Sequence, residues 1–135
     1  MYKILICDDE RDIRNALRIY LTGEGYAVCE AASGAEALEL LRREAVQLVL
    51  MDIMMPGMDG ITAMAKLREF SNIPVILLTA KSEDSDKILG LSVGADDYIT
   101  KPFNPVEVLA RVKSQLRRFL QLGAAVKAPS ELTVG

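Results

Sequence analysis

Short apolar runs alternate along this chain with segments in which apolar residues recur at helical spacing. The apolar runs have the length of β-strands and lie near residues 3–7, 27–31, 47–51, 74–78 and 96–100. Strands that alternate with helices in this way are typical of βαβ units and of a parallel sheet. The pattern therefore predicts an α/β fold, a three-layer doubly wound (βα)5 sandwich with five strands and five helices.

Several of the helical segments begin at residues that are typical of helix starts. Ser33 and Glu36 form a capping-box pattern at the start of the second segment. Asp59 is suited to cap the third, and Asn104 precedes Pro105 at the start of the last. These residues predict where three of the helices begin.

The fourth helical segment, about residues 83–93, has the weakest pattern. It contains Gly90, ends at Gly94 and has few apolar positions to bury. A segment with little apolar anchoring has low local stability. We therefore expect this helix to be a place where the fold can respond to a signal.

The helical pattern of the last segment fades after Gln121. Residues 123–130, Gly-Ala-Ala-Val-Lys-Ala-Pro-Ser, are typical of a linker, and residues 131–135 resemble the opening of another strand. We expect residues 1–121 to form one domain, and residues 122–135 to be a linker and the start of a C-terminal domain.

Composition and charge restrict the possible partners and the setting. The 135 residues carry a net charge of −3 with a pI near 5.0, which argues against direct binding of nucleic acid. Contact with DNA would need another domain. Cys7 and Cys29 lie in apolar runs without C-x-x-C spacing, so we expect free thiols and a reducing, cytoplasmic setting. The sequence contains no signal-sequence pattern and no apolar stretch long enough to span a bilayer.

Polar residues stand where four of the predicted strands end. They are Asp8 and Asp9, Asp52, Thr79, and Lys101. In an open parallel sheet, ligands bind outside the carboxyl ends of the strands, so these side chains should share one pocket. Three carboxylates repel one another unless a cation neutralises them. Because the chain has no histidine, oxygen ligands and a hard ion such as Mg²⁺ are favoured over zinc.

Each of these residues also has a simpler explanation when it is taken alone. Asp8 and Asp9 could favour the N-terminal dipole of a helix. Thr79 could be a turn hydroxyl, and Lys101 a solvated loop lysine. Their recurrence at equivalent strand ends favours a shared site.

Five motifs occur in order along the chain: Asp8-Asp9, Met51-Asp52-Ile53-Met54-Met55-Pro56-Gly57-Met58-Asp59-Gly60, Thr79-Ala80, Gly94-Ala95-Asp96-Asp97-Tyr98 and Lys101-Pro102-Phe103. Together they resemble the motifs of the receiver domain of a bacterial two-component response regulator of the OmpR/PhoB-like subfamily. The resemblance extends over about residues 3–120 and implies the flavodoxin-like strand order 2-1-3-4-5.

The resemblance implies a role for each acid of the predicted pocket. Asp52 would be the phosphoacceptor, a carboxylate that attacks a phosphoryl group and holds it as an acyl phosphate. Asp8 and Asp9 would hold Mg²⁺ together with Asp52 and the backbone carbonyl of Met54.

The resemblance also implies which residues bind the phosphoryl group and respond to it. Lys101 would neutralise charge on the phosphoryl oxygens from a position next to a cis peptide bond with Pro102. Thr79 would donate a hydrogen bond to a phosphoryl oxygen. Thr79 and Tyr98 would then act as the switch, by moving when the group is attached.

A homodimer through the fourth helix, the fifth strand and the last helix is implied as well. Glu107 and Arg111 could instead be a simple pair four residues apart on a solvated helix face. The implied intersubunit pairs are Lys87 with Glu107, Asp97 with Arg111 and Asp96 with Arg118, around apolar contacts that include Leu91 and Ala110.

The sequence thus predicts a receiver that a histidine kinase phosphorylates and that controls transcription by dimerising, through a DNA-binding domain. It would be a regulatory domain that assists its own phosphorylation and dephosphorylation, and not an enzyme. One alternative is a Mg²⁺-dependent phosphohydrolase with an aspartate nucleophile, but such enzymes need a second acid where Met54 stands. A flavin or dinucleotide carrier would need a glycine-rich loop where residues 8–11 are Asp-Asp-Glu-Arg.

Overall fold

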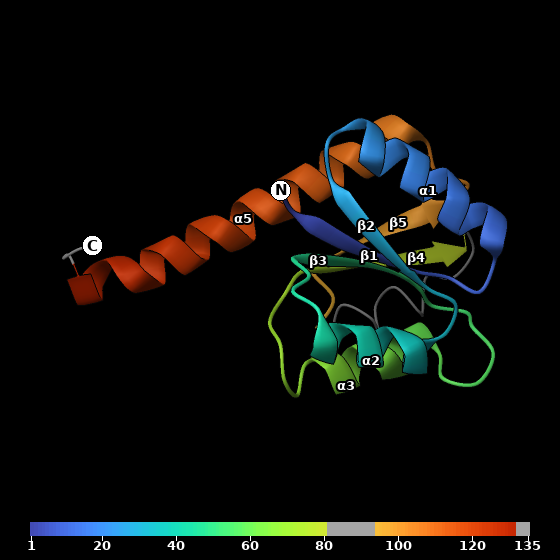
Figure 1. Cartoon of the computed structure of the whole chain (residues 1–135), viewed down its shortest axis with the longest axis horizontal. Coiled ribbons are helices and arrows are strands. Elements are labelled where there is room, and N and C mark those ends of the chain that lie inside the picture. The colour runs from blue at the N-terminus through green and yellow to red at the C-terminus, as the bar shows by residue number, and fades with distance from the viewer. Residues whose placement is uncertain (81–93, 132–135) are drawn as a thin grey trace.

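Five parallel strands form a single sheet in the order β2-β1-β3-β4-β5, as the resemblance implied (Figure 1). The computed structural model describes residues 1–80 and 94–131, with side chains to residue 120. Every predicted strand is confirmed to within two residues at each end. The strands are β1 (Lys3–Cys7), β2 (Ala27–Ala31), β3 (Leu48–Asp52), β4 (Val75–Ala80) and β5 (Asp97–Lys101).

Helices cover both faces of the sheet and give the predicted three layers. In Figure 1, α1 and α5 lie on one face, and α2 and α3 lie on the other. The predicted fourth helix, with Lys87 and Leu91, lies outside the described residues. The described helices are α1 (Arg11–Gly23), α2 (Gly34–Arg43), α3 (Gly60–Leu67) and α5 (Pro105–Glu131).

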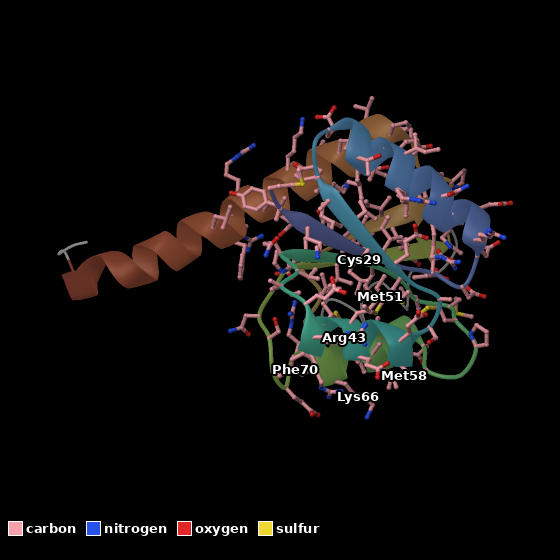
Figure 2. The ribbon with its side chains drawn as sticks, viewed as in Figure 1. Cys29, Arg43, Met51, Met58, Lys66 and Phe70 are labelled. Carbon is pink, nitrogen blue, oxygen red and sulfur yellow. The ribbon has the colours of Figure 1, made fainter. Side chains whose placement is uncertain are left out.

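The apolar strand runs are continuous because each strand contributes to two cores. In β1, Ile4 and Ile6 pack in the core beneath α1 and α5, whereas Leu5 and Cys7 pack in the core beneath α2 and α3. Successive strand side chains point to opposite faces, so the central strands β1, β3 and β4 are buried almost throughout, whereas the edge strands β2 and β5 are mostly half-buried. Met51 of β3 lies between the sheet and the α2 and α3 layer (Figure 2).

The three predicted helix starts are confirmed. Each capping side chain accepts a hydrogen bond from a backbone N–H three residues later and so satisfies a donor that has no partner within the helix. The bonds are from the Glu36 N–H to Ser33 Oγ at 3.2 Å, from the Thr62 N–H to Asp59 Oδ1 at 2.7 Å and from the Glu107 N–H to Asn104 Oδ1 at 2.8 Å.

The last helix continues beyond the residue at which the hydrophobic pattern predicted its end. It runs to Glu131 through residues expected to be linker, and its final turns project away from the body of the domain (Figure 1). Three alanines in residues 124–128 favour a helix, whereas Gly123 and Pro129 disfavour one, so intrinsic propensity alone does not account for the extension. Beyond Glu131, the predicted strand lies outside the described residues, and the domain division stays a prediction.

Cys7 and Cys29 are both free thiols, as predicted; Cys7 is buried and Cys29 is half-buried. Among residues 1–80 and 94–131, no helix has the length and apolarity needed to cross a membrane.

Candidate functional site

The carboxyl ends of the strands bring the predicted acids together. Asp8 directly follows β1, Asp52 is the last residue of β3, and Asp9 lies in the loop that leads to α1. One carboxylate oxygen from each of the three lies within 4.8 Å of the others. Asp8 and Asp52 are buried, whereas Asp9 is exposed, so the cluster opens to solvent on one side.

Lys101, at the end of β5, places its ammonium group between two of these carboxylates. Its Nζ lies 3.1 Å from Asp8 Oδ2 and 3.1 Å from Asp52 Oδ1. Glu10 Oε1 lies 3.8 Å from the same nitrogen. The peptide bond from Lys101 to Pro102 is cis, as the resemblance implied. The ammonium therefore supplies part of the positive charge that the buried acids require.

Burial and mutual repulsion shift the proton affinities in the pocket. Burial, followed by the charge of Asp8, raises the pKa of Asp52 to about 6, although Lys101 acts in the opposite direction. Burial alone would lower the pKa of Lys101, but the charges of Asp52 and Asp8 outweigh it and raise that pKa. Asp52 therefore keeps its proton to a higher pH than an ordinary aspartate, mainly because it is buried.

This donor set fits a hard divalent cation. Three carboxylates and one ammonium leave the pocket net negative, and burial together with the charges of Asp8 and Asp9 raises the pKa of Asp52. Carboxylate and carbonyl oxygens are the ligands that Mg²⁺ prefers. Met54 follows in the loop after β3, and its side chain is 61% exposed, so the loop is open to solvent beside the acids.

The two predicted switch residues lie on neighbouring strands. Thr79 of β4 is 1% exposed, and its hydroxyl donates to the carbonyl of Ala80 at 3.3 Å. Tyr98 of β5 stands beside Leu77 in the sheet register and packs against the core beneath α2 and α3. The structure therefore places Thr79 at the strand ends with the acids, and Tyr98 three residues before Lys101.

In the single chain, three residues of the predicted dimer interface on β5 and α5 pair with one another. Arg111 Nη1 lies 2.9 Å from both carboxylate oxygens of Asp97, and Arg111 Nε lies 3.2 Å from Glu107 Oε2. Ala110 and Arg118 are exposed on α5. The intersubunit pairing of these residues stays a prediction.

Asp96 has partners in its own chain that the sequence did not indicate. Its Oδ2 accepts hydrogen bonds from the Val75 N–H at 2.8 Å and from Arg68 Nη2 at 2.9 Å. Arg68 also donates to the carbonyl of Gly94 through Nε at 3.1 Å and through Nη2 at 2.8 Å. These contacts tie the end of α3 to the amino-terminal ends of β4 and β5, opposite the acidic pocket.

Sequence reasoning missed Arg14, which contacts the acidic loop. Its Nη1 donates to the backbone carbonyl of Asp8 at 2.7 Å. Arg14 stands in the first turns of α1, where the helix dipole disfavours a cation. Arg11 also lies in the first turn of α1, so this placement does not single out Arg14 in the sequence.

Comparison with known proteins gives consistent matches over most of the chain. Residues 4–113 match the family model described as the response regulator receiver domain. Regulatory protein VanRc of Enterococcus gallinarum is 44% identical over 128 residues, which are 95% of this chain and 55% of that protein. Response regulator GtcR of Aneurinibacillus migulanus is 50% identical over 115 residues, 85% of this chain and 48% of that protein. The chain thus spans about half the length of these curated relatives.

Solved structures agree with the sequence matches. A crystal structure from Chloroflexus aurantiacus, described as that of a response regulator, has a TM-score of 0.83 at 38% identity. The match covers 86% of this chain and 98% of the other.

Proposed function

The chain belongs to the family of response regulator receiver domains, and on that premise we propose that phosphorylation of Asp52 switches it. The phosphoryl donor would be a phosphohistidine of a sensor histidine kinase. One observation carries the proposal for this particular chain. A buried aspartate with a raised pKa lies 3.1 Å from a lysine ammonium and shares its pocket with two further acids.

The proposed reaction is a direct phosphoryl transfer. A carboxylate oxygen of Asp52 forms a bond to phosphorus while the bond from phosphorus to the donor imidazole nitrogen breaks. The electron pair of the broken bond returns to the imidazole. Because such transfers require mainly positioning and charge neutralisation, a fixed carboxylate beside a fixed ammonium group supplies what the protein must contribute.

Asp8, Asp9, Asp52 and the backbone carbonyl of Met54 would hold Mg²⁺. When it is bound, Mg²⁺ would neutralise charge that builds up on the phosphoryl oxygens. The ammonium group of Lys101 would contact one phosphoryl oxygen in addition to the carboxylates. The hydroxyl of Thr79 would donate a hydrogen bond to another phosphoryl oxygen. Asp52 and Thr79 are both buried and so make few contacts with bulk water, which supports this assignment.

A phosphohydrolase with the same nucleophile is not favoured. Turnover in such enzymes needs a second acid two residues after the nucleophile, and Met54 carries a thioether that cannot transfer a proton. Its exposed side chain points to solvent rather than into the acidic cluster. We therefore propose a switch, which retains its phosphoryl group long enough to signal.

The proposed output is control of transcription through dimerisation. The chain spans about half of relatives whose names describe regulators, and a DNA-binding domain would lie in the other half. The dimer would use the fourth helix, β5 and α5. The free thiols agree with the proposed cytoplasmic setting, where a histidine kinase would deliver its phosphoryl group.

The test is incubation of the chain with Mg²⁺ and acetyl phosphate, followed by intact mass measurement. We expect one phosphoryl adduct on the wild type, and none on Asp52→Asn or when EDTA replaces Mg²⁺. Asp59→Asn is the matched control, because it makes the same chemical change at an exposed aspartate and retains an N-cap acceptor. An adduct on Asp52→Asn equal to that on the wild type would refute the proposal.

A further inference from the structure

Arg14 joins the acidic loop to the edge strand of the sheet. Its Nη1 donates to the backbone carbonyl of Asp8 at 2.7 Å, and its Nε donates to Glu30 Oε1, in β2, at 3.2 Å. The Arg14 side chain is only 16% exposed. One guanidinium group therefore makes two directed hydrogen bonds, to a main-chain atom of the pocket and to a carboxylate outside it.

The carboxylate of Glu30 is itself held from two sides. Its second oxygen, Oε2, lies 2.9 Å from Arg18 Nε, one turn further along α1. The backbone N–H of Asp8 donates to the carbonyl of Ala31, also in β2, at 3.1 Å. A hydrogen bond to β2 thus fixes the backbone N–H of Asp8, and a hydrogen bond from Arg14 fixes its carbonyl. Glu30 of β2 in turn orients Arg14.

The carbonyl that Arg14 holds belongs to the peptide bond between Asp8 and Asp9. A peptide unit is planar, so fixing its oxygen also fixes the direction in which the chain enters Asp9. The carboxylate of Asp8 is held separately, by the Glu10 N–H at 2.9 Å and by Lys101. Asp9 is exposed, and therefore depends on its main chain for position.

We infer that Arg14 is a positioning residue for the Mg²⁺ ligands Asp8 and Asp9, an inference that rests on the proposed function. Mg²⁺ demands nearly ideal octahedral geometry, and groups that orient metal ligands affect affinity strongly. Arg14 acts through the peptide plane and does not touch the metal or the phosphoryl group. Lysine could keep the charge but could not span Asp8 and Glu30 with a planar fork.

Arg68 provides a matched control at the other end of the sheet. It is also a partly buried arginine that donates to backbone carbonyls, those of Gly94 and Ile73, and pairs with an acid, Asp96. Its loss removes the same kind of contact without touching the acidic loop. A purely structural role for Arg14 predicts that the two arginines behave alike.

The test measures two quantities in the 135-residue chain as a function of Mg²⁺ concentration: the rate of adduct formation from acetyl phosphate and, without a phosphodonor, the rise in melting temperature that Mg²⁺ binding produces. For Arg14→Gln we expect the half-saturating Mg²⁺ concentration to rise about tenfold, with a smaller change in the rate at saturating Mg²⁺. Arg14→Lys should show an intermediate rise. Arg68→Gln should stay within about twofold of the wild type even if its melting temperature falls.

A half-saturating concentration for Arg14→Gln that matches the wild type, or that rises no more than for Arg68→Gln, overturns the inference. If Arg14→Gln does not fold, Arg14→Lys decides, and an unchanged value in that variant overturns it equally. Absence of any adduct on the wild type would instead refute the proposed function, so the two failures are distinguishable.

Discussion

Asp52 carries a negative charge in a place where the protein alone does not fully compensate it. Its pKa of about 6 in the folded state exceeds the ordinary value of 3.8, because of burial and the nearby charge of Asp8. The folded state therefore binds the proton more tightly than the unfolded state. Ionisation of Asp52 thus lowers the free energy of unfolding as pH rises from about 4 to 6, and the full loss is present above that window.

We predict that Asp52→Asn stabilises the metal-free protein at pH 7.5. The shift of about two pKa units corresponds to about 1–3 kcal/mol in the free energy of unfolding. Urea denaturation in EDTA measures it, with Asp59→Asn as the control. The advantage of Asp52→Asn over the wild type should shrink at pH 4. A variant that is less stable than the wild type at pH 7.5 contradicts this description of the pocket.

At the residue level, the sequence was sufficient to predict the site residues that lie at strand ends. It was not sufficient to predict the residues whose role depends on tertiary contacts. Asp52 and Lys101 could be predicted because a parallel sheet gathers its carboxyl ends. Arg14 and Arg68 could not, because each donates to backbone carbonyls whose positions depend on how distant elements pack. A sequence pattern contains no signal for a carbonyl acceptor.

At the scale of elements, the junction between β3 and α3 sets how the loop after Asp52 is built. Gly60 begins α3, and its N–H donates to the carbonyl of Ile53 at 2.9 Å. A Cβ at this position would overlap the backbone carbonyl of Asp52. The close approach of the two segments therefore requires glycine.

We predict that Gly60→Ala lowers the free energy of unfolding by about 1–3 kcal/mol, because the backbone of β3 must shift to admit the methyl group. Gly23→Ala is the control, since a Cβ there meets no atom within 4 Å and alanine favours a helix. Chemical denaturation of both variants tests this. Equal stability of Gly60→Ala and the wild type would show that the junction is looser than the structure indicates.

Element boundaries were predictable where an apolar run or a capping residue marks them. β1 and β2 match their predicted ranges because each is a short run that contributes apolar side chains to the cores on both faces of the sheet. The predicted end of α5 was wrong because the backbone stays helical to Glu131, beyond the residue at which the apolar pattern fades. Strand order came from family resemblance, since hydrophobic spacing alone does not specify which strands pair.

At the scale of the whole molecule, the proposed dimer must form beside ion pairs that already exist within one chain. Arg111 holds Asp97, and Asp96 holds Arg68, so those acids are not free in the monomer. Exposed ion pairs contribute little affinity individually. The charges on β5 and α5 should therefore determine register and partner choice more than the strength of association.

We predict that beryllofluoride with Mg²⁺, a mimic of the phosphoryl group, lowers the dimer dissociation constant at least about tenfold, which equals about 1.4 kcal/mol. Arg118→Glu should remove most of this effect. Lys113→Glu makes a charge-reversing change on the same helix at a residue that pairs with Glu24, and should retain it. Sedimentation velocity distinguishes the outcomes, and an unchanged monomer at high concentration contradicts the proposed dimer.

The most direct test of the central claim locates the phosphoryl group chemically. Borohydride reduces an acyl phosphate to the corresponding alcohol, which marks the modified aspartate permanently for peptide mass mapping. After treatment with Mg²⁺ and acetyl phosphate, we predict that position 52 alone is reduced, and that EDTA abolishes the product. Reduction at Asp8, Asp9 or another aspartate, with Asp52 intact, would contradict the assignment of Asp52 as the phosphoacceptor.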